Sequence, residues 1–285
     1  MGPVAEVLIT GAGGQLGQEL SRAFAGAALG LGHDELDVSD AGAVARVVRR
    51  ERPRLILHAA AWTDVDGCER DPERAWRVNV EGSAHLGRAA AEAGAQILYI
   101  STDYVFGGDA RAPIPPDAPV APRSTYGRSK LGGELAVQSL VGARAWIVRT
   151  SWVFGARGRN FPRTILTLAR QGRPLRVVDD QVGCPTYARD LAGWLERFVS
   201  LGAPSGTYHA ANAGACSWHE FAQWLVRAAG LETVVERCST GELGRPAPRP
   251  AFSVLNTASF AALVGPLRHH RDAALEFLRE MEREQ

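Results

Sequence analysis

Short hydrophobic runs alternate with amphipathic segments through the first half of the chain. The runs are apolar enough for buried strands and cover residues 4–10, 54–58, 96–100 and 144–149. Helical patterns lie between them, at residues 18–25, about 40–50 and 71–93. Strands that alternate with helices indicate a parallel sheet with helices on both faces. We therefore predict an α/β fold with a doubly wound parallel sheet over residues 1–150. The second strand, within residues 27–33, is poorly marked because it lacks a β-branched run.

Beyond residue 150 the alternation loosens and the predicted elements become shorter. Helices are expected at residues 160–171, 186–200, 217–229, 257–264 and 271–283, and short strands at residues 206–210 and 233–237. These elements predict a smaller C-terminal lobe over residues 151–285. We expect this lobe to bind substrate, and some of its segments to return to the first domain.

A glycine-rich turn joins the first predicted strand to the first predicted helix. It reads Gly11-Ala-Gly-Gly-Gln-Leu-Gly17. A strand, a glycine turn and a helix in this order let the backbone approach a pyrophosphate at the helix N-terminus. The spacing is G-x-x-G-x-x-G rather than G-x-G-x-x-G, and a turn with only a structural role is the alternative. The turn favours a Rossmann-type dinucleotide site, and its candidate cofactor-binding residues are Gly11, Gly13, Gly14, Gln15 and Leu16.

Two other strand ends carry candidate binding residues. Ala59, Ala60 and Ala61 follow the strand at 54–58, where small side chains would let a flat cofactor lie against the backbone. Close helix packing explains these alanines equally well. The strand at 96–100 leads into Ser101-Thr-Asp-Tyr-Val-Phe106, which places hydroxyl and carboxylate groups where open α/β sheets bind ligands.

The chain contains a single lysine, Lys130, among 32 basic residues. Arg and Lys serve equally well on a solvated surface, so the exception indicates a site that needs a compact ammonium group. Tyr126 lies four residues earlier, on the same face of a predicted helix. A fixed cation stabilises a phenolate, so we expect Lys130 to lower the pKa of the Tyr126 phenol. This pair is a candidate for proton-transfer chemistry; a chance Tyr-x-x-x-Lys on a surface helix is the alternative.

Composition argues against several classes of protein. The net charge of +1 and the scattered arginines do not favour a nucleic-acid or membrane partner. No segment is apolar enough to span a membrane, and the four cysteines form no C-x-x-C pair. The histidines show no metal-ligand spacing. We therefore expect a cytoplasmic protein without a metal, a disulfide framework or a signal peptide.

Several motifs carry a resemblance to a known family. TGAGGQLG at 10–17, the alanines at 59–61, Thr102 and Tyr126-x-x-x-Lys130 resemble the extended short-chain dehydrogenase/reductases. STDYVFGG at 101–108, RTSWVFG at 149–155, DQVGCPTYARDLA at 180–192 and RPAPRPAFSVLNT at 245–257 are similar to the dTDP-4-dehydrorhamnose reductase family. The resemblance covers almost the whole chain. It implies reduction of the 4-keto group of dTDP-4-dehydro-L-rhamnose by NAD(P)H to give dTDP-L-rhamnose.

The resemblance also implies roles for individual residues. Tyr126 would be the general acid at the C4 oxygen, Lys130 would hold the nicotinamide ribose, and Thr102 would donate a hydrogen bond at the carbonyl. The other implied substrate-binding residues are Asp103, Trp152, Asn160 and Phe161. Arg249, with Arg245, suits the diphosphate because a guanidinium engages two phosphate oxygens at once.

The cofactor is expected to be NADPH, with NADH also accepted. Asp37 would lie at the adenine, and Val38 beside it is assigned to the cofactor site too. His33 stands where many family members have Lys or Arg, and a mostly neutral imidazole attracts a 2′-phosphate less strongly. A related epimerase or dehydratase and a non-catalytic NADP-binding regulatory subunit are the alternatives. The expected assembly is a monomer or a homodimer.

Overall fold

A six-stranded parallel sheet forms the centre of the protein. The computed structural model describes residues 6–283, so the first two positions of the predicted strand 4–10 lie outside the described residues. The strand order is β10-β5-β4-β3-β1-β2, and every neighbouring pair is parallel. The strands are β1 (Val7–Thr10), β2 (Ala28–Leu31), β3 (Leu55–His58), β4 (Gln96–Thr102), β5 (Ala145–Thr150) and β10 (Gly206–His209). The predicted doubly wound fold is confirmed.

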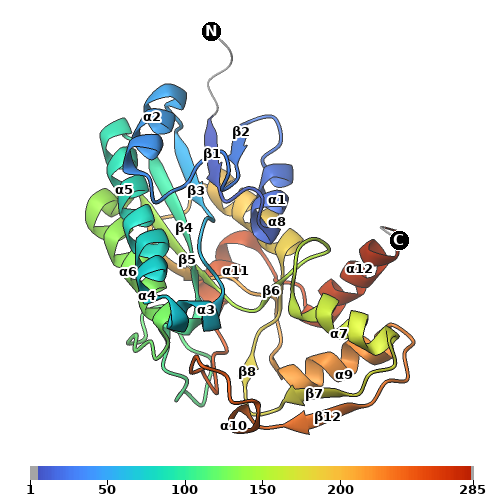
Figure 1. The fold of residues 1–285 in the computed structure, drawn as a ribbon. Coiled ribbons are helices and arrows are strands. Elements are labelled where there is room, and N and C mark those ends of the chain that lie inside the picture. The colour runs from blue at the N-terminus through green and yellow to red at the C-terminus, as the bar shows by residue number, and fades with distance from the viewer. Residues whose placement is uncertain (1–5, 284–285) are drawn as a thin grey trace.

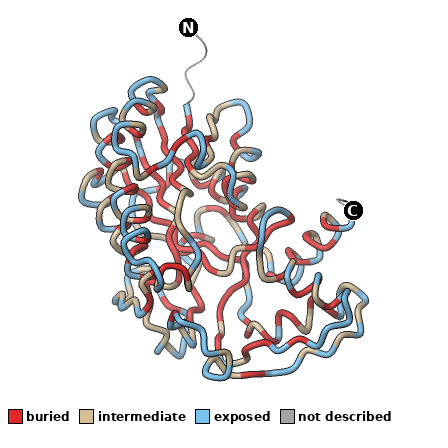
Figure 2. Tube along the Cα trace, in the orientation of Figure 1, coloured by how far each residue is buried: buried red, intermediate tan, exposed pale blue. Residues whose placement is uncertain are grey.

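Helices cover both faces of this sheet (Figure 1). One layer consists of α2 (Ala41–Glu51), α5 (Gly82–Ala93) and α6 (Thr125–Val141). The opposite layer consists of α1 (Gln15–Ala23), α8 (Ala188–Ser200) and α11 (Ala258–Val264). Leu8 packs in the first layer's core and Ile9 in the second, because successive strand residues point to opposite faces. Figure 2 shows the buried strands between helices whose outer faces are exposed.

The poorly marked second strand is present at the edge of the sheet. In β2 only Leu31 is fully buried, so an edge strand of this kind does not need a long β-branched run. A β-carbon added at Gly30 would lie 2.8 Å from Ser21 Oγ of α1. Helix α1 therefore packs too closely on β2 for a larger residue at this position.

The predicted helix at 71–93 consists of several shorter segments. They are α4 (Pro72–Trp76), a π-helical turn (Arg77–Glu81) and α5, and a separate short helix, α3 (Val65–Arg70), precedes them. Asp71 caps α4 by accepting a hydrogen bond from the Arg74 amide, and Pro72 occupies the first helical position. The π-helical turn places buried Asn79 against the backbone of Trp62, where its amide makes hydrogen bonds of 2.8 and 3.1 Å.

The remaining elements form a lobe beside the carboxyl ends of the strands (Figure 1). Three two-stranded sheets lie here: β6 (Val153–Phe154) with β9 (Thr186–Tyr187), β8 (Val182–Gly183) with β11 (Cys216–Ser217), and β7 (Leu175–Val178) with β12 (Val235–Cys238). Its helices are α7 (Phe161–Arg170), α9 (Trp218–Ala228), α10 (Thr240–Leu243) and α12 (His270–Arg283). Short 3-10 turns at Asp103–Val105 and Gly142–Arg144 complete the structure. No helix within residues 6–283 has the length and apolarity needed to cross a membrane.

Candidate active site

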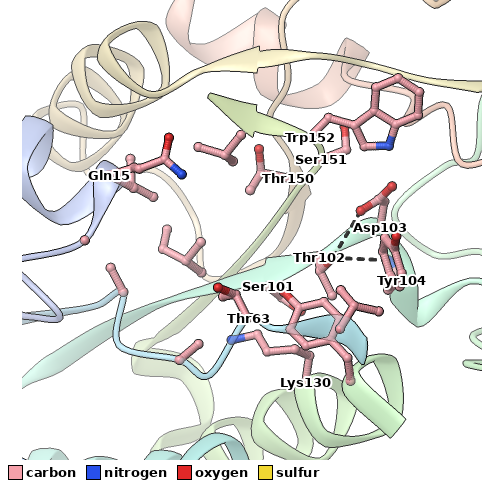
Figure 3. A pocket seen from close by; sticks show the side chains of 18 of the residues that line it. Gln15, Thr63, Ser101, Thr102, Asp103, Tyr104, Lys130, Thr150, Ser151 and Trp152 are labelled. Carbon is pink, nitrogen blue, oxygen red and sulfur yellow. Dashed lines mark hydrogen bonds between the residues drawn. The ribbon is translucent and has the colours of Figure 1, made fainter. Parts of the chain in front are cut away.

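Four strand ends meet around one cavity of about 390 Å³. The glycine turn after β1, the alanines after β3, the Ser101–Tyr104 segment of β4 and the Thr150–Trp152 segment of β5 all contribute to its wall. Tyr126 and Lys130 of α6 complete it, as Figure 3 shows for Lys130. The cavity therefore lies where an open α/β sheet binds its ligands.

Local contacts fix the start of α6 and thereby the two side chains. Ser124 is the N-cap and accepts a hydrogen bond of 3.0 Å from the Gly127 amide. Glu69 of α3 accepts hydrogen bonds from the amide and the hydroxyl of Thr125, at 2.6 and 2.7 Å. Tyr126 and Lys130 follow one turn apart and are 9% and 3% exposed. The spacing in the sequence thus brings both groups to one buried helix face.

The pKa of the Tyr126 phenol differs from the sequence-based expectation. Burial raises this pKa above its usual range, and nearby Asp103 and Tyr104 add to the rise. A hydrogen bond with Thr102 acts in the opposite direction, whereas Lys130 is not among the groups that lower the pKa. The expectation that Lys130 lowers it was wrong, because the loss of solvent around the phenol dominates. A phenol with a raised pKa stays protonated, which suits a proton donor.

The Lys130 ammonium faces the cavity without a polar partner. Its Nζ lies 4.0 Å from the centroid of the Tyr99 ring, and within residues 6–283 it makes no hydrogen bond or ion pair. Burial lowers the pKa of Lys130 to about 7, and the charge of Glu134 opposes the shift. Glu134 is engaged elsewhere, because its carboxylate accepts bonds of 2.9 and 2.8 Å from the buried Arg149 guanidinium. The three donors of Lys130 are therefore available to a ligand.

Thr102 and Asp103 form a hydrogen-bonded unit on the other side of Tyr126. The Thr102 hydroxyl donates to Asp103 at 3.1 Å, and the Ser253 hydroxyl donates to the other carboxylate oxygen at 2.6 Å. Burial raises the pKa of Asp103 to about 6, although both hydrogen bonds act against the shift. Ser253 was not predicted to contribute to the site, since it lies 150 residues along the chain from its partner.

The glycine turn has the geometry of a dinucleotide site. Gly11 has a φ of +71°, and a β-carbon there would lie 2.7 Å from the Ala60 backbone. A β-carbon at Gly17 would lie 2.1 Å from the Gly11 carbonyl oxygen, so α1 could not start so close to the turn with a larger residue.

Two buried hydroxyls in the cavity wall, Ser101 and Thr150, have no hydrogen-bond partner among the described residues. Buried polar atoms need partners, so a polar ligand fits here.

A second cavity of about 650 Å³ continues from the glycine turn toward the end of β2. It shares four lining residues with the first cavity, namely Gly11, Gly14, Ala59 and Ala61. An extended ligand can therefore lie across both. Every residue predicted to bind the cofactor lines one or both cavities: Gly11, Gly13, Gly14, Gln15, Leu16, His33, Asp37, Val38, Ala59, Ala60, Ala61, Tyr126 and Lys130. Arg74 also lines the second cavity, with its guanidinium 4.6 Å from the Trp62 ring centroid, and was not predicted.

A third cavity, of about 350 Å³, lies between α7, α9, β7 and the loop at 244–250. Phe161, Arg245 and Arg249 line it. Arg249 is fixed by Asp66 at 2.9 Å, and Arg245 approaches the same carboxylate at 3.5 Å. Burial alone would raise the pKa of Asp66, but bonds from Arg249 and the Ala247 amide lower it below its usual range. The loop is therefore tied to α3 in a fixed position.

The predicted substrate residues fall into three groups. Thr102, Asp103 and Trp152 line the first cavity, whereas Phe161 and Arg249 line the third. Asn160 lines none of the three cavities. Its side chain caps α7 by accepting from the Arg163 amide, and it donates to Gln15 at 2.9 Å and to the Gly155 carbonyl at 2.7 Å. Asn160 thus supports Gln15, which lines the first cavity.

Trp218 was missed by sequence reasoning although it lines both the first and the third cavity. It is the first residue of α9, and no glycine turn or tyrosine–lysine pair accompanies it. Tyr104, which also lines both cavities, lies inside the STDYVF segment and could have been singled out there.

The fold, the glycine turn and the buried tyrosine and lysine define a Rossmann-type oxidoreductase. Residues 5–283 match the RmlD substrate binding domain family, and the chain belongs to this family. It is 42% identical over 283 residues to the dTDP-4-dehydrorhamnose reductase of Streptomyces griseus, covering 94% of this chain and 91% of the relative. The family predicted from the sequence motifs is thereby confirmed.

Two further comparisons extend this result. The chain is 40% identical over 278 residues to a probable dTDP-4,6-dihydroxy-2-methyloxan-3-one 4-ketoreductase of Streptomyces antibioticus, covering 94% of this chain and 93% of the relative. The crystal structure of dTDP-4-dehydrorhamnose reductase from Bacillus anthracis in complex with NADP is similar with a TM-score of 0.92. The identity is 35%, and the match covers 96% of this chain and 98% of that chain.

Proposed function

We propose that this protein reduces the 4-keto group of dTDP-4-dehydro-L-rhamnose with NADPH and thereby forms dTDP-L-rhamnose. The observation that carries the proposal is the position of Tyr126. Tyr126 lines the first cavity together with Thr102 and Lys130, and this cavity shares lining residues both with the second cavity and with the arginine-lined third cavity. The family of the chain and the names of its relatives support this substrate.

Each polar side chain around the ketone has a role in this proposal. The chemistry that NADPH supplies is hydride transfer to C4. Tyr126 donates its proton to the C4 oxygen as negative charge develops there, and its raised pKa keeps the proton in place until that moment. Thr102 orients the phenol, and in this proposal its hydroxyl turns from Asp103 to donate its hydrogen bond at the carbonyl. Lys130 binds the ribose hydroxyls with its three N–H donors, which make no hydrogen bond to any described residue.

The nucleotide part of the substrate is assigned to the third cavity. Arg249 and Arg245 would bind the diphosphate, because a guanidinium fork matches two phosphate oxygens. Asp66 holds Arg249 in place before the substrate arrives, so little side-chain entropy is lost on binding. Asp103 and Trp152 would contact the sugar, and Phe161 the more distant part of the nucleotide. We further expect a cytoplasmic monomer or homodimer.

Coupled turnover tests the proposal. The substrate is generated from dTDP-glucose with a dehydratase and an epimerase, and loss of NADPH absorbance is followed after this protein is added. The expected result is one NADPH oxidised for each dTDP-L-rhamnose formed. Binding of NADPH without turnover would favour a regulatory subunit, and turnover without NADPH consumption would favour an epimerase or dehydratase.

A different dTDP-linked ketone is the second candidate substrate. The relative from Streptomyces antibioticus is a probable reductase of such a compound and is nearly as similar to this chain. Comparing kcat/KM for the two ketones in the same assay distinguishes the candidates. A higher value for the other ketone would move the assignment to it.

A further inference from the structure

Trp152 has a backbone conformation that residues other than glycine rarely adopt. Its φ is +48°, in the left-handed region, and such a conformation is strained for a residue with a side chain. Trp152 follows β5 directly and lines the first cavity (Figure 3). Strain of this kind persists only where the surrounding structure fixes it, and it concentrates at functional sites.

The backbone around Trp152 is fixed by the C-terminal lobe. The Ser151 hydroxyl donates to the Cys184 carbonyl at 2.6 Å, and the Thr186 amide donates to the Trp152 carbonyl at 3.2 Å. Immediately afterwards β6 pairs with β9. These contacts hold residues 151–154 against residues 184–187, and they explain how the strained conformation is retained.

The Trp152 indole is fixed as well. It stacks on the Trp218 indole with ring centroids 3.5 Å apart and an angle of 6° between the planes. Trp218 is itself placed by the Ser217 capping box at the start of α9. A β-carbon added at Gly183 would lie 2.6 Å from Cε2 of Trp152, so any larger residue there would displace the ring. Gly183 pairs with Cys216, two residues before Trp218.

Of the two stacked indoles, Trp218 lies at the junction of two cavities and Trp152 lines the first of them. Only Tyr104 and Trp218 line both the first and the third cavity within the described residues. A substrate whose ketone is at Tyr126 and whose diphosphate is at Arg249 must pass this junction with its sugar ring. A deoxyhexose has apolar C–H faces, and such surfaces pack well on aromatic rings.

We propose that Trp218 and Gly183 hold the Trp152 indole rigidly between them, so that the part of the ring that faces the first cavity forms a fixed wall for the deoxysugar of the substrate. The inference rests on the proposed function, because it takes the substrate to be a nucleotide linked to a deoxysugar. Trp218 supports one face of the Trp152 ring and also lines the junction itself, whereas Gly183 acts only by leaving room for the ring.

Equilibrium binding of dTDP and of dTDP-L-rhamnose tests this proposal by calorimetry. The ratio of the two dissociation constants measures what the sugar adds to binding. We expect Trp218→Leu and Gly183→Ala each to reduce this ratio about five- to tenfold, the size of an aromatic packing contribution. Binding of NADPH should stay within about twofold in both variants, and binding of dTDP alone should stay within about twofold in Gly183→Ala. Trp218→Phe keeps an aromatic ring and should recover part of the lost ratio.

The control is Trp76→Leu, which removes an indole that is 51% exposed and lines none of the three cavities. This variant should leave the ratio unchanged. The inference would be overturned if the variants at 183 and 218 kept the wild-type ratio. It would also be overturned if they weakened the binding of dTDP as much as the binding of dTDP-L-rhamnose. The proposed function would instead be contradicted if wild-type protein bound dTDP-L-rhamnose no more tightly than dTDP and turned over no ketone.

Discussion

The two ends of the cofactor crevice differ in how far they exclude water. At the catalytic end Thr102, Asp103, Tyr126 and Lys130 are all at most 9% exposed. At the adenosine end His33, Asp34, Glu35 and Asp37 are all exposed. Burial shifts every titratable group of the first set away from its usual pKa, whereas a local hydrogen bond from Ser39 chiefly lowers the pKa of Asp37.

This difference predicts unequal consequences of substitution. A buried group with no solvent around it interacts strongly with its neighbours, because the local dielectric constant is low. An exposed group is screened by water and salt, and its contribution is small. Changes at the catalytic end should therefore alter rate or stability by orders of magnitude, and changes at the adenosine end should alter only cofactor preference.

The largest expected effect is that of Tyr126→Phe. This change removes the proton donor and keeps the ring, so kcat should fall by about 10²–10⁴, the usual contribution of a general acid. The dissociation constant of NADPH, measured by fluorescence titration, should stay near the wild-type value. Retention of more than about a tenth of kcat would mean that another group protonates the ketone.

The catalytic end was more accessible to prediction than the rest of the site, for a physical reason. The glycine turn and the Tyr126–Lys130 pair are local in sequence, so strand and helix geometry alone places them. Trp218 and Arg74 reach the cavities only through packing between distant segments, which no local pattern reports. The direction of the Tyr126 pKa shift was mistaken because it depends on burial, and burial is a property of the whole fold.

The elements show the same division. Long amphipathic helices such as α2 and α8 were predicted from their periodicity, and the structure shows that Asp40 is the N-cap of α2. Strand β10 was recognised as a strand, but the sequence alone does not show that it pairs with β5 at the edge of the main sheet. Edge strand β2 lacked a clear signal because it is only partly buried.

Breaking the buried ion pair behind Lys130 should have the next largest effect. Arg149 and Glu134 are 7% and 1% exposed as side chains, and removing one partner leaves an uncompensated buried charge. Arg149→Met should therefore lower the free energy of unfolding by about 3–5 kcal/mol in urea titrations. The double variant Arg149→Met/Glu134→Leu removes both charges and should recover much of the loss. A double variant no more stable than the single one would show that packing, not charge, sets the effect.

Lys130→Met sharpens the comparison through pH. The pKa of Lys130 is lowered from 10.5 to about 7 in the folded protein. Above pH 10.5 the amine is neutral in both the folded and the unfolded protein. As the pH falls toward 7, the unfolded chain binds a proton at Lys130 and the folded chain does not, so the free energy of unfolding decreases. Replacing Lys130 with Met removes this decrease. Without NADPH the variant should exceed wild type in stability by a few kcal/mol near pH 7, and the difference should shrink toward pH 10.

Lys130→Arg is the matched control for that experiment. The guanidinium is larger and stays protonated at every accessible pH, so this variant should gain no stability and should lose activity as well. Urea titrations between about pH 7 and 10 compare the three proteins. A stability difference between wild type and Lys130→Met that does not change with pH would mean that Lys130 is charged in the folded protein throughout.

The smallest expected effect belongs to the exposed end and concerns the choice of cofactor. Glu35 accepts a 2.8 Å bond from the Gly32 amide, and Asp37 accepts bonds of 2.9 and 2.7 Å from Ser39. Both carboxylates are thus turned toward their own backbone, and His33 and Arg74 are the basic residues of this cavity. If His33 meets the 2′-phosphate, His33→Arg should raise the ratio of kcat/KM for NADPH to that for NADH by about two- to fivefold, as expected for an exposed ion pair. Arg74→Ala is the discriminating variant: a preference lost there and kept in His33→Ala would place the phosphate beside Trp62, on the far side of the crevice from β2.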